Sequence, residues 1–241
     1  MPMMYGTHFN DTLIGQGGNE LIYGFLGNDF IDSGAGNDTV YGGEGSDIIL
    51  ARSGQDLVHG GFDDDYIWGG SSEDMLYGDT GDDYLNGGDH NDQLHGGVGF
   101  DTLVGGAGDD TLWGSDDYDA SEVDELIGGE GRDRFHLGRF NRNFYDNGGD
   151  NDYALIKDFS EIDEIILGEG SYNTRQLLLG TGIYQGSELL AIVQGVGKHQ
   201  AITFEEVGFT TKATLTSTLS TVEGTFFNLS PGTTFPDSFY L

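Results

Sequence analysis

A carboxylate recurs every nine residues through the first half of the chain. Eleven of these positions are Asp and one is Glu: Asp11, Glu20, Asp29, Asp38, Asp47, Asp56, Asp65, Asp74, Asp83, Asp92, Asp101 and Asp110. Carboxylates set among glycine-rich segments, whose main-chain carbonyls can approach an ion, supply the hard oxygen ligands that Ca²⁺ prefers. Mg²⁺ is a weaker candidate because it requires a tighter octahedron and keeps its waters. The chain has no Cys and its six His show no ligand spacing, so thiolate and imidazole metals lack their ligands.

The carboxylates belong to a nine-residue repeat that runs without a gap from residue 6 to residue 113. Typical units read GGEGSDIIL (42–50) and GGVGFDTLV (96–104), so the carboxylate holds position six. Position eight is aliphatic in all twelve units, and position one is Gly in ten, with Ser33 and Ala51 as exceptions. A repeat this regular predicts a solenoid in which each unit is one supersecondary element.

Nine residues suit one short strand and one tight turn. Gly at positions one, two and four lets the turn adopt positive φ angles, and positions seven to nine are expected to form the strand with position eight pointing inward. Two units then make one coil of 18 residues, and odd and even units stack as two parallel sheets of six strands each. The sequence therefore predicts an all-β fold, a parallel β-roll with a thin aliphatic core.

Charge makes such a roll unstable without cations. The whole chain carries 42 acidic and 9 basic residues, a formal charge of −33, and Arg52 is the one basic residue within 6–113. Position-six carboxylates 18 residues apart, such as Asp29 and Asp47, would repel each other across one strand spacing. There are ten such pairs, so we expect up to about ten Ca²⁺ ions, each shared by two stacked carboxylates. The alternative is a metal-free solenoid with a solvated acidic rim, which leaves this repulsion unanswered.

The same charge excludes whole classes of partner. A strongly negative surface is repelled by nucleic acid and by anionic membranes. No segment approaches the length of apolar sequence needed for a membrane span. Residues 1–15 lack the basic and apolar regions of a Sec signal peptide, so export would use another route.

The repeat resembles the GGxGxDxUx nonapeptide of repeats-in-toxin (RTX) proteins. The resemblance implies a right-handed parallel β-roll, with Ca²⁺ bound by the position-six Asp side chains and turn carbonyls. It also implies type I secretion through an uncleaved C-terminal signal, and folding outside the cell, where Ca²⁺ is abundant.

The periodicity breaks at residues 114–118 and resumes at 119–136, where Asp124 and Asp133 are nine apart and join the candidate metal ligands. This pattern predicts one more coil after a five-residue bulge. Asp116, Asp117 and Asp119 either add a site or form a solvated loop. We expect the roll to span 1–136.

Residues 137–241 are expected to form a small β-rich capping domain. Apolar segments at 152–159, 163–167, 188–196 and 200–207 read as strands, and together they resemble the C-terminal cap of cyanobacterial RTX proteins. The tail from Leu215 fits either a type I secretion signal or the last strand of the cap.

Aromatic side chains recur at position nine of the even units: Tyr23, Tyr41, His59, Tyr77, His95 and Trp113. They form either a stacking ladder or an interface. HExxH, GxSxG and P-loop motifs are missing, so we predict that the chain is not an enzyme. The sequence favours a secreted, extracellular Ca²⁺-binding protein with a surface or matrix role that self-assembles into an oligomer, fibre or surface layer. The main alternative is an adhesion module that binds cell-surface glycan through the aromatic ladder.

Overall fold

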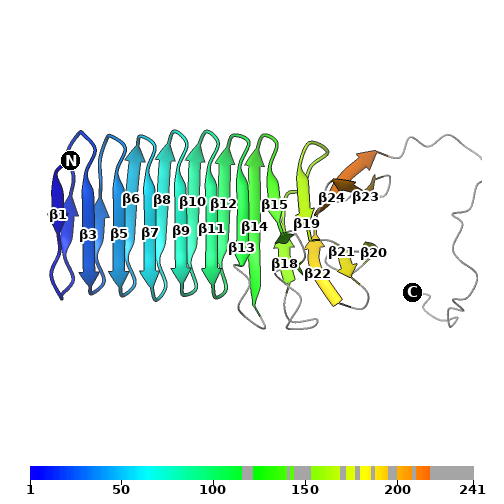
Figure 1. The fold of residues 1–241 in the computed structure, drawn as a ribbon, viewed down its shortest axis with the longest axis horizontal. Coiled ribbons are helices and arrows are strands. Elements are labelled where there is room, and N and C mark those ends of the chain that lie inside the picture. The colour runs from blue at the N-terminus through cyan, green and yellow to red at the C-terminus, as the bar shows by residue number, and fades with distance from the viewer. Residues whose placement is uncertain are drawn as a thin grey trace, which may run out of the picture.

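The computed structural model describes residues 1–115, 122–139, 142–143, 153–168, 172–176, 180–185, 188–194, 200–207 and 210–217. These residues form strands and connecting turns, with no helix among them (Figure 1). None of them forms a helix that could cross a membrane.

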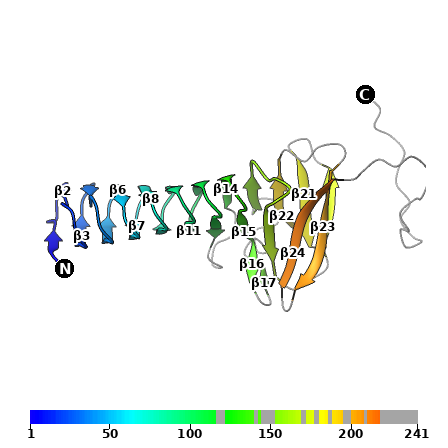
Figure 2. The same cartoon turned by 90° about the horizontal axis from the view of Figure 1, so that it is seen from above.

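The repeat winds into a β-roll of two parallel sheets, as predicted (Figure 1, Figure 2). One sheet contains β1 (Met3–Tyr5), β3 (Leu21–Leu26), β5 (Thr39–Glu44), β7 (Leu57–Phe62), β9 (Met75–Thr80), β11 (Gln93–Val98), β13 (Thr111–Ser115) and β15 (Arg134–His136). The other contains β2 (Thr12–Ile14), β4 (Phe30–Asp32), β6 (Ile48–Ser53), β8 (Tyr66–Ser71), β10 (Tyr84–Asp89), β12 (Thr102–Ala107) and β14 (Val123–Glu130). We call these the β1 sheet and the β2 sheet. The twelve units contribute six strands to each sheet.

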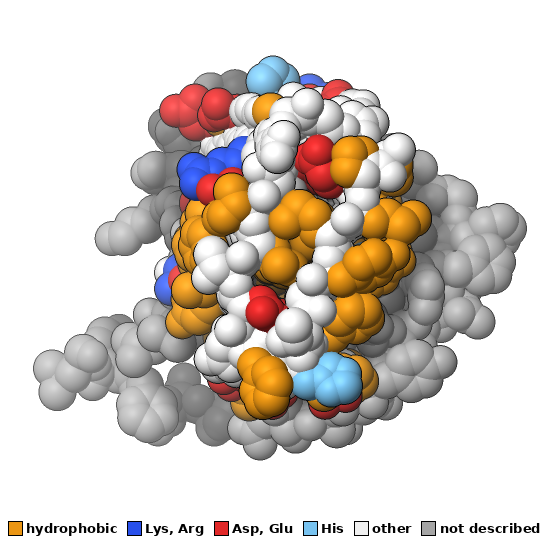
Figure 3. All heavy atoms as spheres, turned by 90° about the vertical axis from the view of Figure 1, so that its left-hand side faces the viewer, with side chains coloured by type: hydrophobic (Ala, Val, Ile, Leu, Met, Phe, Trp, Pro, Cys, Tyr) orange, Lys and Arg blue, Asp and Glu red, His pale blue; other side chains and the backbone are white. Residues whose placement is uncertain are grey.

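Position eight forms the core between the sheets. From Ile22 to Leu112 these eleven side chains are fully buried, whereas Leu13 in the first unit is only partly buried. Seen from the N-terminal end, apolar side chains lie in the middle of the roll and over both outer sides (Figure 3). The inward direction of position eight is therefore confirmed.

The strands are longer than the sequence predicted. Most run for six residues, from position seven of one unit through position three of the next, as in β10, where Gly88 and Asp89 still pair with Gly106 and Ala107 of β12. The prediction of strands at positions seven to nine was wrong because positions two and three of the next unit also pair with the neighbouring coil. The sequence also missed β1, where Met4 pairs with Ile22 one coil before the first complete unit.

The coil expected after the insertion is present. In β14 Leu126 pairs with Leu103, and in β15 Phe135 pairs with Leu112, both 23 residues apart instead of 18. Asp116, Asp117 and Asp119 of the insertion lie outside the described residues.

Parallel stacking continues beyond this coil. β18 (Tyr153–Ile156) pairs with β14, β19 (Glu164–Leu167) pairs with β15, and β22 (Glu188–Val193) adds to β18. Antiparallel strands then complete both sheets: β21 (Thr181–Gln185) and β20 (Tyr172–Gln176) on one, β24 (Thr210–Ser217) and β23 (Gln200–Val207) on the other. β16 (Gly138–Arg139) and β17 (Arg142–Asn143) form a separate antiparallel pair.

The strands expected near 152–159, 163–167, 188–196 and 200–207 correspond to β18, β19, β22 and β23. Residues 215–217 of the tail belong to β24, and the tail after 217 lies outside the described residues. The division of the chain at residue 136 stays a prediction.

The aromatic residues of position nine form a continuous stack on the outer face of the β1 sheet. It consists of Tyr5, Tyr23, Tyr41, His59, Tyr77, His95, Trp113 and His136, with neighbouring centroids 4.1–5.8 Å apart and ring planes within 26° of each other. We call this row the aromatic ladder. Each internal ring has a neighbour on both faces, so the ladder presents ring edges to its surroundings.

Candidate metal centre

The position-six carboxylates form two rows, one along each edge of the roll, at the points where turns enter strands. Each of the ten pairs predicted from the spacing is brought together by one hydrogen bond. The main-chain N–H of the earlier residue donates to Oδ1 of the carboxylate one coil later, at 2.7–2.9 Å, as between Asp47 and Asp65. This bond fixes where each carboxylate lies, and it occupies only one of its two oxygens.

The second oxygen of these carboxylates is buried without a hydrogen-bond donor. This holds for Oδ2 of Asp29, Asp38, Asp47, Asp56, Asp65, Asp74, Asp83, Asp92, Asp101, Asp110 and Asp133, and for Oε2 of Glu20. The side chains themselves are almost fully enclosed; Asp47, Asp65 and Asp110 are 0% exposed. Burying an ionised oxygen without a partner is costly, so each row is a set of sites that a cation would stabilise.

In most units a glycine at position one leaves space beside the unpartnered oxygen. At Gly42, position one of its unit, an added Cβ would lie within 3.0 Å of both Asp47 Oδ2 and the carbonyl oxygen of Gly60 one coil later. The same convergence recurs at Gly78, beside Asp83 Oδ2 and the Gly96 carbonyl. A carboxylate oxygen and a carbonyl oxygen thus point toward one space, which any larger residue would fill.

The pKa values reflect the same electrostatic problem. Burial, more than the nearby carboxylates, raises the pKa of Asp65 and Asp92 to about 8 and that of Asp101 to about 9, while the hydrogen bond from the preceding coil opposes this shift. The pKa of Asp47 and Asp83 is raised to about 7 for the same reasons. At neutral pH the roll therefore favours either a proton or a cation at these five carboxylates.

The donor set fits Ca²⁺. Among the described residues, no three His, Cys, Asp or Glu side chains converge on one point, so main-chain carbonyls must complete any site. Carboxylate and carbonyl oxygens without nitrogen or sulfur are the ligands of a hard cation, and Ca²⁺ tolerates the irregular geometry of turns better than Mg²⁺. A bound Ca²⁺ would supply the positive charge that the unpartnered oxygens lack.

The first carboxylate of each row differs from the rest. Asp11 Oδ2 already accepts the main-chain N–H of Thr7 at 2.6 Å and its hydroxyl at 2.8 Å. Glu20 lies one coil after Pro2, which has no N–H to donate, and this coincides with the one Glu at position six. These two candidates have surroundings unlike those of the central ten.

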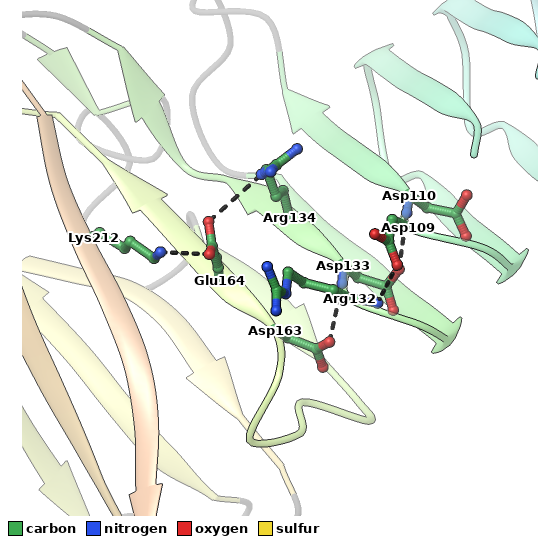
Figure 4. A network of polar contacts seen from close by, with 8 residues as sticks. All are labelled: Asp109, Asp110, Arg132, Asp133, Arg134, Asp163, Glu164 and Lys212. Carbon is green, nitrogen blue, oxygen red and sulfur yellow. Dashed lines mark hydrogen bonds and ion pairs between the residues drawn. The ribbon is translucent and has the colours of Figure 1, made fainter. Parts of the chain in front are cut away.

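The carboxylate rows continue past the insertion. Some of the residues that extend them were predicted from the sequence and others were missed. Asp124 and Asp133, which the spacing assigned to one more coil, accept the N–H groups of Asp101 and Asp110 at 3.0 Å. Asp163 then accepts the N–H of Asp133 at 3.0 Å and continues one row (Figure 4). Its Asp-x-Ile pattern at 163–165 matches positions six to eight, a signal that was read only as a strand.

Two further carboxylates were also missed. Asp158 accepts the N–H groups of Gly128 and Gly129 at 3.0 and 2.8 Å and so covers the turn of the last unit. Glu122 is 3% exposed and lies close enough to Asp101 to help raise the pKa of that carboxyl, although burial, Asp124 and Asp83 raise it more. Neither follows the nine-residue spacing, so the repeat could not reveal them.

Comparison with known families decides the assignment. The RTX calcium-binding nonapeptide repeat matches at residues 5–40, 41–76, 68–103, 86–120 and 123–144, which together span more than half of the chain. The chain belongs to this RTX family. Its two rows of buried carboxylates are therefore the position-six residues of calcium-binding repeats, and residues after 144 lie outside the matched ranges.

Other comparisons add little to the RTX assignment. No curated protein matches the chain. Among solved structures, the extracellular lipase LipA from Serratia marcescens matches over 82% of this chain and 38% of its own, with 18% identity and a TM-score of 0.21. The RTX chain thus spans less than two thirds of that structure. The resemblance of the C-terminal strands to cyanobacterial caps stays a prediction.

Proposed function

We propose that this RTX chain is a secreted protein that binds several Ca²⁺ ions, folds on binding them outside the cell and serves a structural role at a surface or in a matrix. The observation that supports it is the row of position-six carboxylates whose second oxygen is buried without a donor. Such a row disfavours folding when Ca²⁺ is scarce and favours it when Ca²⁺ is plentiful, because binding free energy becomes folding free energy.

The ligands we propose are the fourteen position-six carboxylates from Asp11 to Asp133, with up to about ten Ca²⁺ ions between coils. The central ten carboxylates, from Asp29 to Asp110, have the most uniform surroundings. Within them, the Asp38 and Asp56 turns carry Ser33 and Ala51 where the others carry Gly, so their side chains take up the space beside the carboxylate and we expect weaker binding there.

A calcium titration tests this function. The Ca²⁺-free full chain is titrated with Ca²⁺ while β-structure is followed by circular dichroism and hydrodynamic size by sedimentation. Cooperative gain of β-signal and compaction in the sub-millimolar to millimolar range supports the proposal. An equal response to Mg²⁺, or a fully folded Ca²⁺-free protein at neutral pH, contradicts it.

An extracellular location and type I export are part of this proposal, and RTX family membership and the need for abundant Ca²⁺ support them. Export is tested by expressing the chain, with and without residues 218–241, beside a type I secretion system and measuring protein in the medium. Secretion of the full chain that is lost on truncation supports a C-terminal signal.

Self-assembly has a specific surface to test, the aromatic ladder. Replacing Tyr41 and Tyr77 by Ser should leave Ca²⁺-induced folding intact and weaken assembly seen by electron microscopy. A glycan-binding role for the ladder receives less support, because a sugar stacks on a free ring face and Tyr41 and Tyr77 have rings on both faces. A non-catalytic role is proposed on the motifs alone, and protease, esterase and glycosidase assays test it.

A further inference from the structure

Five residues replace glycine at position two of the repeat, and three of them adopt the backbone conformation that favours glycine. Position two has a positive φ in the regular coils, and Phe25, Arg52 and Asp79 adopt φ values of 82°, 77° and 73° there. L-residues with side chains are disfavoured in this region, so each of the three stores backbone strain. Strain that is retained in an otherwise regular repeat indicates a use for the side chain.

Two of the three residues lie on the same face and bound one groove. On the outer face of the β1 sheet, position two reads Phe25, Gly43, Gly61 and Asp79 in four successive strands. The two glycines leave the surface hollow between the two side chains. The hollow is a groove of about 610 Å³, within the range of small-molecule sites. Three strand spacings make it roughly 14 Å long.

The two walls of the groove carry different kinds of side chain. One wall is the aromatic ladder, where Tyr41 and His59 present their edges with centroids 5.3 Å apart. The opposite wall carries Glu44 and Phe62 from position three, and the Phe62 side chain is 60% exposed. Between them the main chain of Gly43 and Gly61 makes a flat floor, which suits a planar body rather than a bulky one.

The ends of the groove favour positive charge. At one end Asp79 presents a carboxylate whose Oδ2 lies 3.0 Å from His59 Nδ1. At the other end the Phe25 ring is inclined 15° to Tyr23, so that its plane, like those of the ladder, faces along the groove and can meet a cation. Glu44 adds a second carboxylate, and no Lys or Arg lines the groove. An anion would be repelled, and a metal ion would find too few oxygens near an apolar floor.

We propose that this groove is a binding site for a flat, elongated organic cation, with its apolar body on the glycine floor and its positive charge held between Asp79 and Glu44. The site is distinct from the position-six carboxylates, which point into the roll. It requires the folded roll but no particular role for that roll, so it goes beyond the proposed function.

Thioflavin T, a planar benzothiazolium cation that fluoresces when immobilised, is a suitable probe. The Ca²⁺-loaded full chain is titrated with the dye and with its uncharged analogue that lacks the N-methyl group. Circular dichroism confirms folding, and sedimentation confirms that the chain stays unassembled. Saturable binding that favours the cation is expected. No saturable binding by the folded chain, or equal binding of the uncharged analogue, would overturn the proposal.

Consensus-restoring variants locate the site without endangering the fold. Phe25→Gly and Asp79→Gly remove backbone strain, so they should fold at least as well as the parent while they open the two ends of the groove. Asp79→Asn removes only the charge and should weaken dye binding by about 3- to 10-fold. Arg52→Gly is the matched control, since it relieves the same strain on the β2 sheet and should leave dye binding unchanged.

Two results from these variants would contradict the assignment. Unchanged binding in Phe25→Gly, Asp79→Gly and Asp79→Asn would place the dye elsewhere, as would an equal loss in Arg52→Gly. Fluorescence that appears only in sedimenting material would show that the dye reports contact between copies of the chain and not occupation of the groove.

Discussion

The carboxylates of the roll and those that follow it use the same hydrogen bond but end in opposite states. Asp65 and Asp163 each accept an N–H from the preceding coil through Oδ1. In the roll, Asp65 Oδ2 is buried without a donor. Past the last unit, Asp163 Oδ2 accepts the N–H of Ser160 at 2.7 Å. The difference shows that the fold can satisfy this carboxylate itself and that the repeat leaves it to an outside cation.

Basic residues are divided between the two regions in the same way. Eight of the nine Lys and Arg residues follow residue 131, and Arg52 alone lies in the array. Glu164 pairs with Lys212 and lies 3.5 Å from Arg134 (Figure 4). Glu125 pairs with Lys157 at 2.7 Å. The C-terminal strands thus carry their own counter-charges.

The cores differ as well. A roll strand buries one aliphatic side chain at position eight, whereas β21 buries Thr181–Tyr184 and β22 buries Leu189–Val193 without alternation. Strands buried on both faces gain more from the hydrophobic effect per residue. From charge and core together, we expect the roll to depend on Ca²⁺ far more than the C-terminal strands do.

Removing Ca²⁺ should produce the largest separation between the two regions. Chelation at neutral pH should abolish amide-exchange protection across residues 24–113, because the second oxygen of each buried carboxylate then lacks a partner. Protection in β21 and β22 should persist to lower Ca²⁺ concentrations. Hydrogen exchange with mass spectrometry at a series of Ca²⁺ concentrations measures both. Simultaneous loss in the two regions would show that they unfold as one unit and that the contrast has no energetic meaning.

Acid should partly replace Ca²⁺ in the roll. Burial raises the carboxyl pKa from the usual 3.8 to about 6 at Asp110, about 8 at Asp65 and about 9 at Asp101. The Ca²⁺-free folded roll therefore binds protons that the unfolded chain has released. The resulting stability is fully present below pH 3.8 and is lost as the pH rises through about 6 to 9.

The acid effect is measured on dilute, Ca²⁺-free protein by circular dichroism between pH 4 and pH 9. Light scattering in parallel excludes association near the sequence pI of about 4.1. We expect β-signal at the acid end that disappears toward neutral pH. A β-signal that instead rises with pH in the absence of Ca²⁺ would mean that ionised carboxylates are tolerated, and the cation would then be unnecessary.

Removing one buried carboxylate oxygen should weaken Ca²⁺-dependent folding more than removing a negative charge from the surface. Asp65→Asn keeps an oxygen that can accept the N–H of Asp47 but replaces the anionic Oδ2 by an amide nitrogen. The Ca²⁺ concentration at the folding midpoint should rise by about 10-fold, an effect typical for loss of a metal-site group. Asp64→Asn is the matched control. Its exposed oxygen accepts the N–H of Asp82, a bond that Asn10, Asn37 and Asn91 make elsewhere, so the midpoint should barely move.

Equal shifts in these two variants would assign the Ca²⁺ dependence to general charge repulsion. Calcium titrations followed by circular dichroism at fixed ionic strength distinguish the outcomes, because screening reduces a general charge effect and leaves a ligand effect in place.

The glycine beside the carboxylate gives a more local test. In Gly60→Ala the new methyl would lie within 3.0 Å of Asp65 Oδ2, so the space proposed for the ion is filled and the midpoint should rise several-fold, with roughly 1–3 kcal/mol lost from overpacking. Gly17→Ala adds the same methyl where no atom lies within 4 Å and should be neutral. Calcium titration and urea unfolding measure both variants. If Gly60→Ala leaves the Ca²⁺ midpoint and the stability unchanged, the ion does not occupy the space beside Asp65 Oδ2.

Most of the roll could be predicted because a single nine-residue period determines its structure. An aliphatic residue at position eight and a carboxylate at position six recur together, so burial, strand direction and the stacking of Asp47 on Asp65 all follow from spacing. What spacing could not supply were contacts made by single residues. Asp158 reaches a turn 29 residues earlier, and Phe25 occupies a position that the repeat assigns to glycine.

The candidate metal ligands could be predicted from the sequence only as a class of residue. The sequence identified the carboxylates, but it did not show which of their oxygens would lack a donor. Asp11 Oδ2, for example, accepts the N–H and hydroxyl of Thr7 in its own unit, whereas Asp65 Oδ2 has no donor. The C-terminal strands follow no repeat, so their order in the sheets depends on long-range pairing, such as β19 with β24, which local sequence does not encode.

The smallest expected effect concerns the C-terminal strands, whose partly buried carboxylate is neutralised by a basic side chain of the protein itself. Burial opposes ionisation of Glu164, but the hydrogen bond and charge of Lys212, with Arg134, hold the pKa of Glu164 below its usual value. Lys212→Met should therefore destabilise the C-terminal strands by about 1 kcal/mol above pH 4.5, an effect that fades as the pH falls through the lowered pKa. Lys157→Met, at the more exposed pair with Glu125, should cost less. Urea unfolding of the Ca²⁺-loaded protein measures the loss, and the Ca²⁺ midpoint should stay where it was. A raised midpoint in Lys212→Met would mean that these counter-charges also support the carboxylate rows, so that the two regions share one electrostatic balance.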